Sequence, residues 1–216
     1  MWMATRYGIP ILRERLEGPD VLCWFVAGSS VFVCLFVAAF VGFWIEKGRI
    51  TFAGFSSRFR LHRISFADLY WSLGTLVVCG ILSAGILLLW KVTPLRVPNL
   101  SPSFLHMEPL TKDTYWVLVA WLPLFFFNIA GEELWWRGFI LPRQEQQHDR
   151  AAWIIHGLLL ALFHLPLGLD LTIVVSPFLF GLPFVVQRRK NIWTGFIVHG
   201  LLNGGGFLAV AFGVVG

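Results

Sequence analysis

The apolar residues of this chain come in long, nearly uninterrupted stretches, and this constrains the fold more than any other feature. Each stretch is about 20 residues long, which as a helix at ~1.5 Å per residue spans the hydrocarbon core of a bilayer. Hydrophobic residues make up 57% of the 216 residues and charged residues 13%, whereas soluble domains average about 25% charged residues. We therefore predict an integral membrane protein that is an all-α, polytopic helix bundle without a sheet.

Six transmembrane helices are expected from these stretches, in a single domain that covers residues 1–216. Their predicted bounds are Val21–Ile45, Ala67–Trp90, Tyr115–Leu141, Ala151–Leu167, Leu171–Gln187 and Ile192–Val215. The third is long enough to be tilted, or to be two pieces that meet near Gly131, which would give seven or eight helices. The fourth and fifth are short enough that either could be re-entrant. The longest irregular stretch, Lys91–Asp113, contains four prolines and is expected to form an extramembrane loop.

Lys and Arg residues are unequally distributed between the two ends of such a bundle. With six crossings, one end holds both termini, the proline-rich loop and a short turn near residue 168, and carries six Lys and Arg. The other end carries ten, in residues 47–63, 143–150 and 188–190. Because cytoplasmic loops are enriched in Lys and Arg, we expect this basic end to be cytoplasmic and the protein to lie in the plasma membrane. The pI near 9.5 is then a matter of topology and lipid headgroups, and we expect no nucleic acid partner.

Two acidic residues lie inside an apolar run, and they are adjacent. Glu132 and Glu133 lie in FFFNIAGEELWWRGFIL, whereas the other ten acidic residues fall in polar tails, loops or segment ends. A carboxylate near the middle of a bilayer costs roughly 3 kcal/mol on insertion scales, so such residues usually mark a functional site. Glu133 and Arg137 are four residues apart, the favourable order for a helical ion pair. Since Glu132 projects about 100° away from Glu133, we expect Arg137 to hold one acid and to leave the other for chemistry.

Other polar residues in the apolar spans have helical spacing. His199 and Asn203 are four residues apart and therefore share one face of a helix. Counted from the expected basic ends of three helices at ~1.5 Å per residue, four polar residues fall at roughly 10–20 Å depth: Glu132, His164, His199 and Asn203. A lone histidine or asparagine in a span is usually a packing or interhelical contact, and we assign that role to His156, at about 8 Å depth. Because Glu132, His164, His199 and Asn203 agree in depth and in residue type, the sequence predicts an intramembrane site.

Three short motifs resemble those of one protein family. GEELWWRG resembles the EExxxR motif of the CPBP, or Abi, family of intramembrane proteases, which includes CAAX prenyl protease 2 and bacteriocin self-immunity proteins. LLLALFH resembles the family's second motif, FxxxH, although Leu160 stands where the family has Phe, and HGLLN resembles the third, HxxxN. The motifs occur in family order and cover about residues 115–205, the expected catalytic core. Within the first motif, the resemblance implies supporting roles for Glu133 and Arg137.

The resemblance implies hydrolysis of a peptide bond inside a membrane cavity. Carried over position by position, it implies that Glu132 and His164 activate the water, and that His199 and Asn203 stabilise the oxyanion. The chemistry is also reasonable by itself, because burial disfavours the charged form of either residue type. A buried Glu–His pair can therefore exchange a proton near neutral pH, where general acid–base catalysis is most effective. We expect the cavity to open toward the basic, cytoplasmic end, and a membrane-embedded peptide or protein substrate to arrive sideways between helices.

We expect no cofactor, although zinc remains an alternative. Glu132, His164 and His199 are residue types that can bind zinc with an open position, and the family has been described as metalloproteases. An amide such as that of Asn203 is a poor zinc ligand and a good oxyanion donor, which favours a metal-independent glutamate/histidine mechanism. The sequence contains no HExxH, GxSxG or Gly-x-Gly-Asp motif. The spacing of Cys23, Cys34 and Cys79 predicts neither a disulfide framework nor a metal site.

Two other functions use the same buried polar residues. A transporter or proton relay would pass protons or cations along Glu132, His164 and His199, but it predicts an inverted repeat, and the sequence contains none. A non-catalytic membrane partner or bacteriocin-immunity protein is the second alternative. The complete set of four polar positions favours the protease, because an inactive descendant would be free to lose them.

Overall fold

The computed structural model describes all residues except 48–50, 94–96, 101, 103, 105–106 and 215–216. Over the described residues the backbone is helical and contains no β-strand, which confirms the predicted all-α fold. The longer helices are α2 (Val21–Lys47), α4 (Phe66–Val92), α5 (Trp116–Glu132), α7 (Ala152–His164), α8 (Leu169–Arg189) and α9 (Trp193–Ala211). The shorter helices are α1 (Ile9–Arg13), α3 (Phe52–Arg58) and α6 (Leu141–His148), with π-helices η1 (Ala4–Gly8) and η3 (Glu133–Ile140) and 3₁₀ turns η2 (Lys112–Thr114), η4 (Asp149–Ala151) and η5 (Leu165–Leu167).

Five helical stretches of the described chain are long and apolar enough to cross a membrane. They are Val21–Glu46, Phe66–Val92, Trp116–Leu167, Leu169–Arg189 and Trp193–Ala211. The third has 52 residues and folds back after α6, where Asp149 has a positive φ of 44°. It therefore contains the third and fourth predicted spans as its two limbs. The backbone stays helical from α5 into η3, so no break occurs near Gly131, and Val215, the predicted end of the last span, lies outside the described residues.

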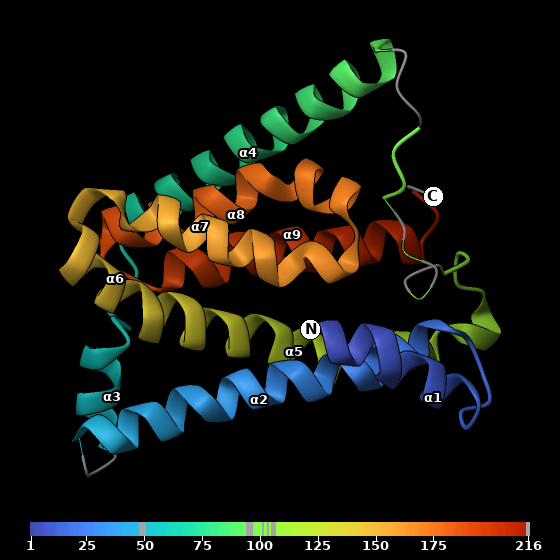
Figure 1. The fold of residues 1–216 in the computed structure, drawn as a ribbon, viewed down its shortest axis with the longest axis horizontal. Helices are drawn as coiled ribbons and strands as arrows, with labels where there is room; N and C mark the ends of the chain where they lie inside the picture. Colours follow the sequence, from blue (N-terminus) through green and yellow to red (C-terminus); the bar gives the residue numbers. More distant parts are fainter. Residues whose placement is uncertain (48–50, 94–96, 101, 103, 105–106, 215–216) are drawn as a thin grey trace.

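The helices form two groups that meet at α9 (Figure 1). Helices α2 and α5 pack side by side, while α7, α8 and α9 form the second group, with α4 on its outer side. Helix α9 also contacts α5, which joins the groups. α1, the connection after α4 and the C-terminus lie toward one end; α3, α6 and the α8–α9 turn lie at the other (Figure 1). The described loops lie at the two ends to which the count of Lys and Arg assigned them. Two of the counted residues, Arg49 and Arg96, lie outside the described residues.

The end that carries the basic loops is closed by apolar packing. Six residues from four segments form one buried cluster there: Ala39, Phe43, Phe59, Leu134, Phe139 and Ile192. Arg58 on α3 donates to the carbonyl oxygen of Gly138 at 3.1 Å and to Glu46 at 2.9 Å. Arg60 pairs with Glu145 at 2.8 Å. These contacts hold α3 against η3 and α6.

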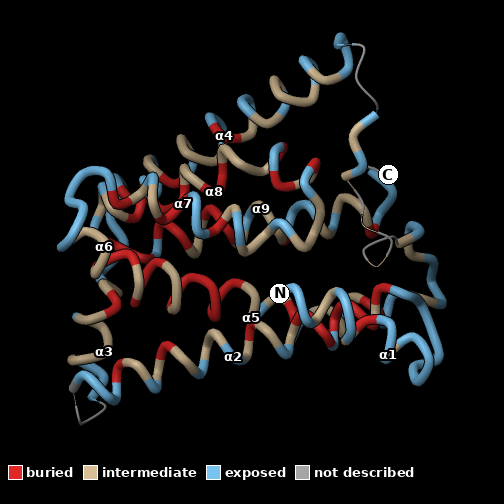
Figure 2. The backbone as a smooth tube through the Cα atoms, in the orientation of Figure 1, coloured by how far each residue is buried: buried red, intermediate tan, exposed pale blue. Residues whose placement is uncertain are grey.

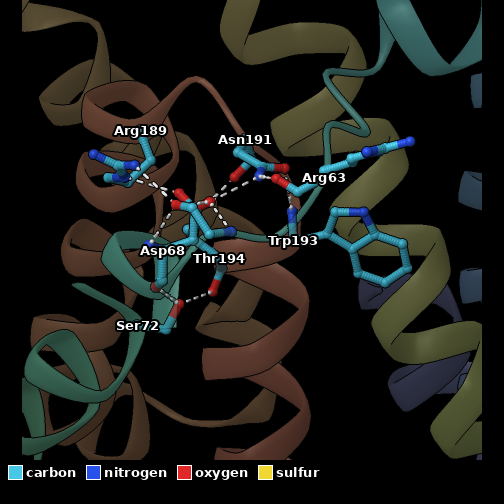
Figure 3. A network of polar contacts seen from close by, with 8 residues as sticks. Arg63, Asp68, Ser72, Arg189, Asn191, Trp193 and Thr194 are labelled. Carbon is cyan, nitrogen blue, oxygen red and sulfur yellow. Dashed lines mark hydrogen bonds and ion pairs between the residues drawn. The ribbon is translucent and has the colours of Figure 1, made fainter. Parts of the chain in front are cut away.

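Helix α4 is fixed to the α8–α9 turn by a buried carboxylate (Figure 3). Asp68 is 3% exposed and accepts from Arg189 Nε at 2.8 Å and Asn191 Nδ2 at 3.2 Å. Ser65 and Asp68 form a capping box at the start of α4, which satisfies two backbone N–H groups that the helix leaves free. Ser72 lies one turn further on and donates to the carbonyl oxygen of Asp68 at 2.7 Å. Asp68 therefore anchors the first turns of α4 to the bundle.

The far half of α4 has few such contacts. Ile81, Leu88 and Val92 are 66%, 64% and 79% exposed, and Figure 2 shows mainly exposed and intermediate residues along this half. Apolar exposure on this scale is expected where a helix faces lipid. α4 is thus attached at one end and little packed at the other.

Replacing Asp68 by Ala should loosen α4, because Arg189 and Asn191 lose their shared acceptor. We expect a loss of stability of about 3 kcal/mol, the scale for breaking a buried charge pair. Thermal unfolding of the purified protein in detergent measures this. Asp113→Ala, at an exposed position, is the matched control and should leave the melting temperature within experimental error. Equal melting temperatures for the two variants would contradict the anchoring role.

Candidate active site

The two adjacent glutamates lie where two kinds of helix meet. α5 ends at Glu132, and the π-helix η3 begins at Glu133. A π-helix has a wider turn than an α-helix and aligns residues five apart. Arg137 Nη1 lies 3.3 Å from Glu133 Oε1 and 3.5 Å from Glu132 Oε2. The prediction that Arg137 serves only one acid is therefore wrong, because the π-helical turn places its guanidinium beside both.

All three side chains of this cluster are removed from solvent. Glu132 and Arg137 are 2% exposed and Glu133 is fully buried. Buried charges are tolerated only when paired and hydrogen-bonded, since their desolvation costs several kcal/mol each. One guanidinium beside two carboxylates leaves a net negative charge, so further hydrogen-bond donors are needed around the acids.

His199 on α9 supplies one of these donors. Its Nδ1 lies 2.9 Å from Glu133 Oε1, and a carboxylate at this nitrogen favours the tautomer with the proton on Nδ1. The approach of α9 depends on Gly195, because a Cβ there would overlap Glu133 Oε2. Gly131 has the same function toward α2, where a Cβ would overlap the carbonyl oxygen of Phe32. The glutamates are thus enclosed by backbone on two sides.

Asn128 is a site residue that the motifs do not contain. Its Nδ2 donates to Glu132 Oε1 at 3.3 Å, and its Oδ1 accepts from Asn203 Nδ2 at 2.7 Å. Asn203 Nδ2 also lies 3.0 Å from His199 Nε2. Together with Arg137, these contacts close a ring of six side chains, which we call the polar ring: Asn128, Glu132, Glu133, Arg137, His199 and Asn203. Asn128 lies one turn before Glu132 within an apolar run, and that spacing could have identified it from the sequence.

His164 lies outside the polar ring. Its Nδ1 is bonded to the carbonyl oxygen of Leu160 at 2.8 Å, an interaction in which the ring nitrogen must donate. In the neutral ring, Nε2 then carries the lone pair. No direct hydrogen bond links His164 to Glu132 among the described residues. Both residues line one cavity.

This cavity has a volume of about 610 Å³ and is mainly apolar. α2, α5, α8 and α9 supply most of its wall, and the polar ring contributes all its members except Glu133. The wall continues to Met1, Leu100 and Met107, at the end that holds the termini. We predicted extension toward the basic end. The lining residues show the opposite, because the cluster around Phe59 fills the basic end.

The remaining predicted residues lie apart from the cavity. His156 is fully buried, with Nδ1 2.6 Å from Gln144 Oε1 and its ring against Trp136, in keeping with a packing role. Cys23, Cys34 and Cys79 are free thiols.

The zinc alternative does not fit this arrangement. Both ring nitrogens of His199 are engaged, with Glu133 and with Asn203. His164 uses Nδ1 for the Leu160 carbonyl, and Glu132 is bonded to Asn128 and Arg137. In the described part of the chain, no three His, Cys, Asp or Glu residues are grouped as metal ligands. Zinc at these residues would require the polar ring to open.

The fold and this site define a helical membrane protein with a buried acid, histidine and amide centre beside an apolar cavity. Residues 114–205 match the family model of the type II CAAX prenyl endopeptidases, Rce1-like. The match begins in η2 and ends in α9, so it contains every member of the polar ring and His164. The resemblance inferred from the three motifs is thereby confirmed. No curated protein and no solved structure matches the chain.

Glu133→Gln should destabilise the protein more than Glu132→Gln does. Glu133 is fully buried and holds both Arg137 and His199, and loss of one partner from a buried charge pair costs roughly 3–5 kcal/mol. Glu132 makes longer contacts, of 3.3 and 3.5 Å, so Glu132→Gln should stay folded. Unfolding in detergent measures both, and the reverse order of stability would show that the two roles are exchanged.

Two glycines of α9 provide a test that changes no charge. Gly195→Ala places a methyl group against Glu133 Oε2 and should weaken the same contacts, whereas nothing lies within 4 Å of a Cβ at Gly200. Gly200→Ala should therefore be neutral or slightly stabilising, because Ala favours a helix over Gly by about 1 kcal/mol.

Proposed function

We propose that this protein is an intramembrane endopeptidase that hydrolyses a peptide bond of a membrane-embedded peptide or protein. The observation that carries the proposal is one cavity that joins an apolar interior to Glu132, His164 and Asn203. An apolar cavity with a few convergent polar groups is the usual form of a ligand site. The description of the matching family, CAAX prenyl endopeptidases, gives the class of bond.

Water activation falls to Glu132 and His164. Nδ1 of His164 is held by the Leu160 carbonyl, which leaves the Nε2 lone pair of the neutral ring to accept a hydrogen bond from a water. Glu132 lines the cavity while Asn128 and Arg137 hold its orientation. A water between the two side chains gives a proton to Glu132 as its oxygen attacks the scissile carbonyl carbon, and Glu132 returns this proton to the leaving amine as the C–N bond breaks. A positioned general base contributes about 10²–10⁴ in rate.

Oxyanion stabilisation falls to Asn203, with His199 beside it. In the polar ring the Asn203 amide donates to Asn128 and to His199 Nε2, so an N–H must leave one partner to reach the oxyanion. Donation by His199 likewise requires a proton on Nε2 in place of the Asn203 contact. Loss of one oxyanion donor typically costs 10²–10³ in rate.

Metal independence is part of this proposal. Its support is that His199 has no nitrogen available for a metal while the polar ring is closed.

The substrate is proposed to arrive sideways through the lipid-facing helices, since a lipid-embedded peptide has no path through solvent. α4 is the least packed of these helices, and its Ser83 lines the cavity.

The wild-type protein in liposomes should cleave a quenched fluorescent peptide held in the membrane. Two probes are needed, a farnesylated peptide with a CAAX terminus and an unprenylated transmembrane peptide. Glu132→Gln and His164→Ala should each lower the rate by at least about 10² without changing the melting temperature. His148→Ala, at an exposed histidine of α6, is the matched control and should cleave like the wild type.

Chelation provides the second arm of this experiment. EDTA and 1,10-phenanthroline should leave the wild-type rate unchanged if the mechanism is metal-independent. Cleavage that survives His164→Ala would end the glutamate/histidine mechanism. Absence of cleavage with both probes would favour the relay or binding-partner functions.

The basic end is proposed to be cytoplasmic and the cavity to extend toward the opposite face of the plasma membrane. Gln147, in α6, and Asp113, in η2, are exposed at opposite ends. In a cysteine-free background, an impermeant maleimide added to whole cells should label Asp113→Cys and should reach Gln147→Cys only after lysis. Labelling of Gln147→Cys in intact cells would reverse the orientation.

A further inference from the structure

Asn128 lies between the two halves of the polar ring. It is on α5, one turn before Glu132, and it is half-buried at the cavity wall. Its two polar atoms face different partners: Nδ2 faces Glu132 at 3.3 Å, and Oδ1 faces Asn203 Nδ2 at 2.7 Å. Asn128 is therefore the direct link between an acid proposed to activate water and an amide proposed to bind the oxyanion.

The direction of the hydrogen bonds follows from Glu132. An ionised carboxylate can only accept, so Asn128 must present its NH₂ group to it and its oxygen to Asn203. Asn203 must then present its own NH₂ group, and a second N–H of that group meets His199 Nε2 at 3.0 Å. His199 accepts there and so carries its proton on Nδ1, toward Glu133. The charge on Glu132 thus determines the amide orientation of Asn203, and this orientation matches the His199 tautomer that Glu133 also favours.

We propose that Asn128 is a positioning residue that couples the protonation of Glu132 to the orientation of the Asn203 amide. While Glu132 is ionised, Asn128 Oδ1 holds one Asn203 N–H and His199 Nε2 holds the other, so both stay within the ring. When Glu132 takes the proton of the attacking water, its new O–H can donate to an amide oxygen, and Asn128 is free to turn. The Asn203 N–H is then released as negative charge forms on the carbonyl oxygen. This inference rests on the proposed protease function.

A purely structural role is the alternative, in which Asn128 only bridges α5 and α9. Two substitutions of similar volume separate the alternatives. Asn128→Leu fills the space but has neither donor nor acceptor. Asn128→Asp keeps an acceptor for Asn203 and loses the donor to Glu132, unless the two carboxyl groups share one proton. Sharing becomes possible as the pH falls, since adjacent carboxyls cannot both ionise easily.

The test measures cleavage of the farnesylated CAAX peptide from pH 5 to 9 in liposomes, with kcat and KM separated. Asn128→Leu should lower kcat about 10–100-fold at every pH, because displacing a catalytic group by about 1 Å can cost about 10²-fold, with KM within about twofold. At neutral pH, Asn128→Asp should lower kcat as much as Asn128→Leu does, but its kcat should recover as the pH falls. Wild-type kcat should not rise with acidity. Retention of at least half of kcat by Asn128→Leu, or parallel pH profiles for Asn128→Asp and the wild type, would overturn the proposal.

A readout that needs no cleavage separates this inference from the protease function. Nitrogen-15 NMR of histidine-labelled protein should show His199 fixed with its proton on Nδ1 in the wild type. In Asn128→Leu the Nε2 signal of His199 should shift, because the Asn203 amide is no longer oriented toward it, while the signals of His164, which is bonded to Leu160, stay unchanged. An unchanged His199 spectrum would overturn the coupling. If the spectrum changes but the wild type cleaves no probe, the coupling stands and the protease function falls.

Discussion

The interaction on which the rest of the structure depends is the burial of two adjacent carboxylates beside a single guanidinium. Glu132, Glu133 and Arg137 lie where an α-helix becomes a π-helix, and they leave one negative charge without a cationic partner. In a medium of low dielectric that charge must be met by hydrogen-bond donors. Asn128, on the same helix, donates a hydrogen bond to Glu132, and His199, on α9, donates one to Glu133. The charge balance of three residues therefore determines where α9 must lie.

The packing of the helices reflects this requirement. α9 can approach Glu133 because position 195 is a glycine, and α5 can approach α2 because position 131 is a glycine. A side chain at either position would separate the backbones that exclude water from the acids. The stability of the bundle and the geometry of the site are thus produced by the same contacts, so a substitution that alters the ring is expected to affect both.

Much of this arrangement could be predicted from the sequence, and the failures have physical causes. The positions of the helices that can cross a membrane follow from the length of the apolar stretches, because a bilayer fixes how long a spanning helix must be; the third and fourth predicted spans fall within one of the five stretches of the described chain. Four residues of the proposed site follow from spacing and depth. The sharing of Arg137 did not follow, since ideal α-helical geometry places Glu132 about 100° from Glu133 and nothing in the motif signals a π-helix. Asn128 was missed because a lone asparagine in a span usually serves as an interhelical contact.

The direction of the cavity could not be predicted from charge, because charge reports topology and not packing. The basic residues mark an end where Arg58 binds backbone carbonyls and Phe59 is fully buried. Asp68 anchors α4 at that same end, whereas its opposite half is exposed. Helix α4 is therefore held at the basic end and little packed along its other half, whereas a buried cluster around Trp24 and Phe25 packs against Met1 and Met107. A firmly held polar ring beside a helix that is little packed along one half suits the proposed hydrolysis of membrane-embedded chains, because the geometry of the ring is kept while the α4 side can adapt to a substrate.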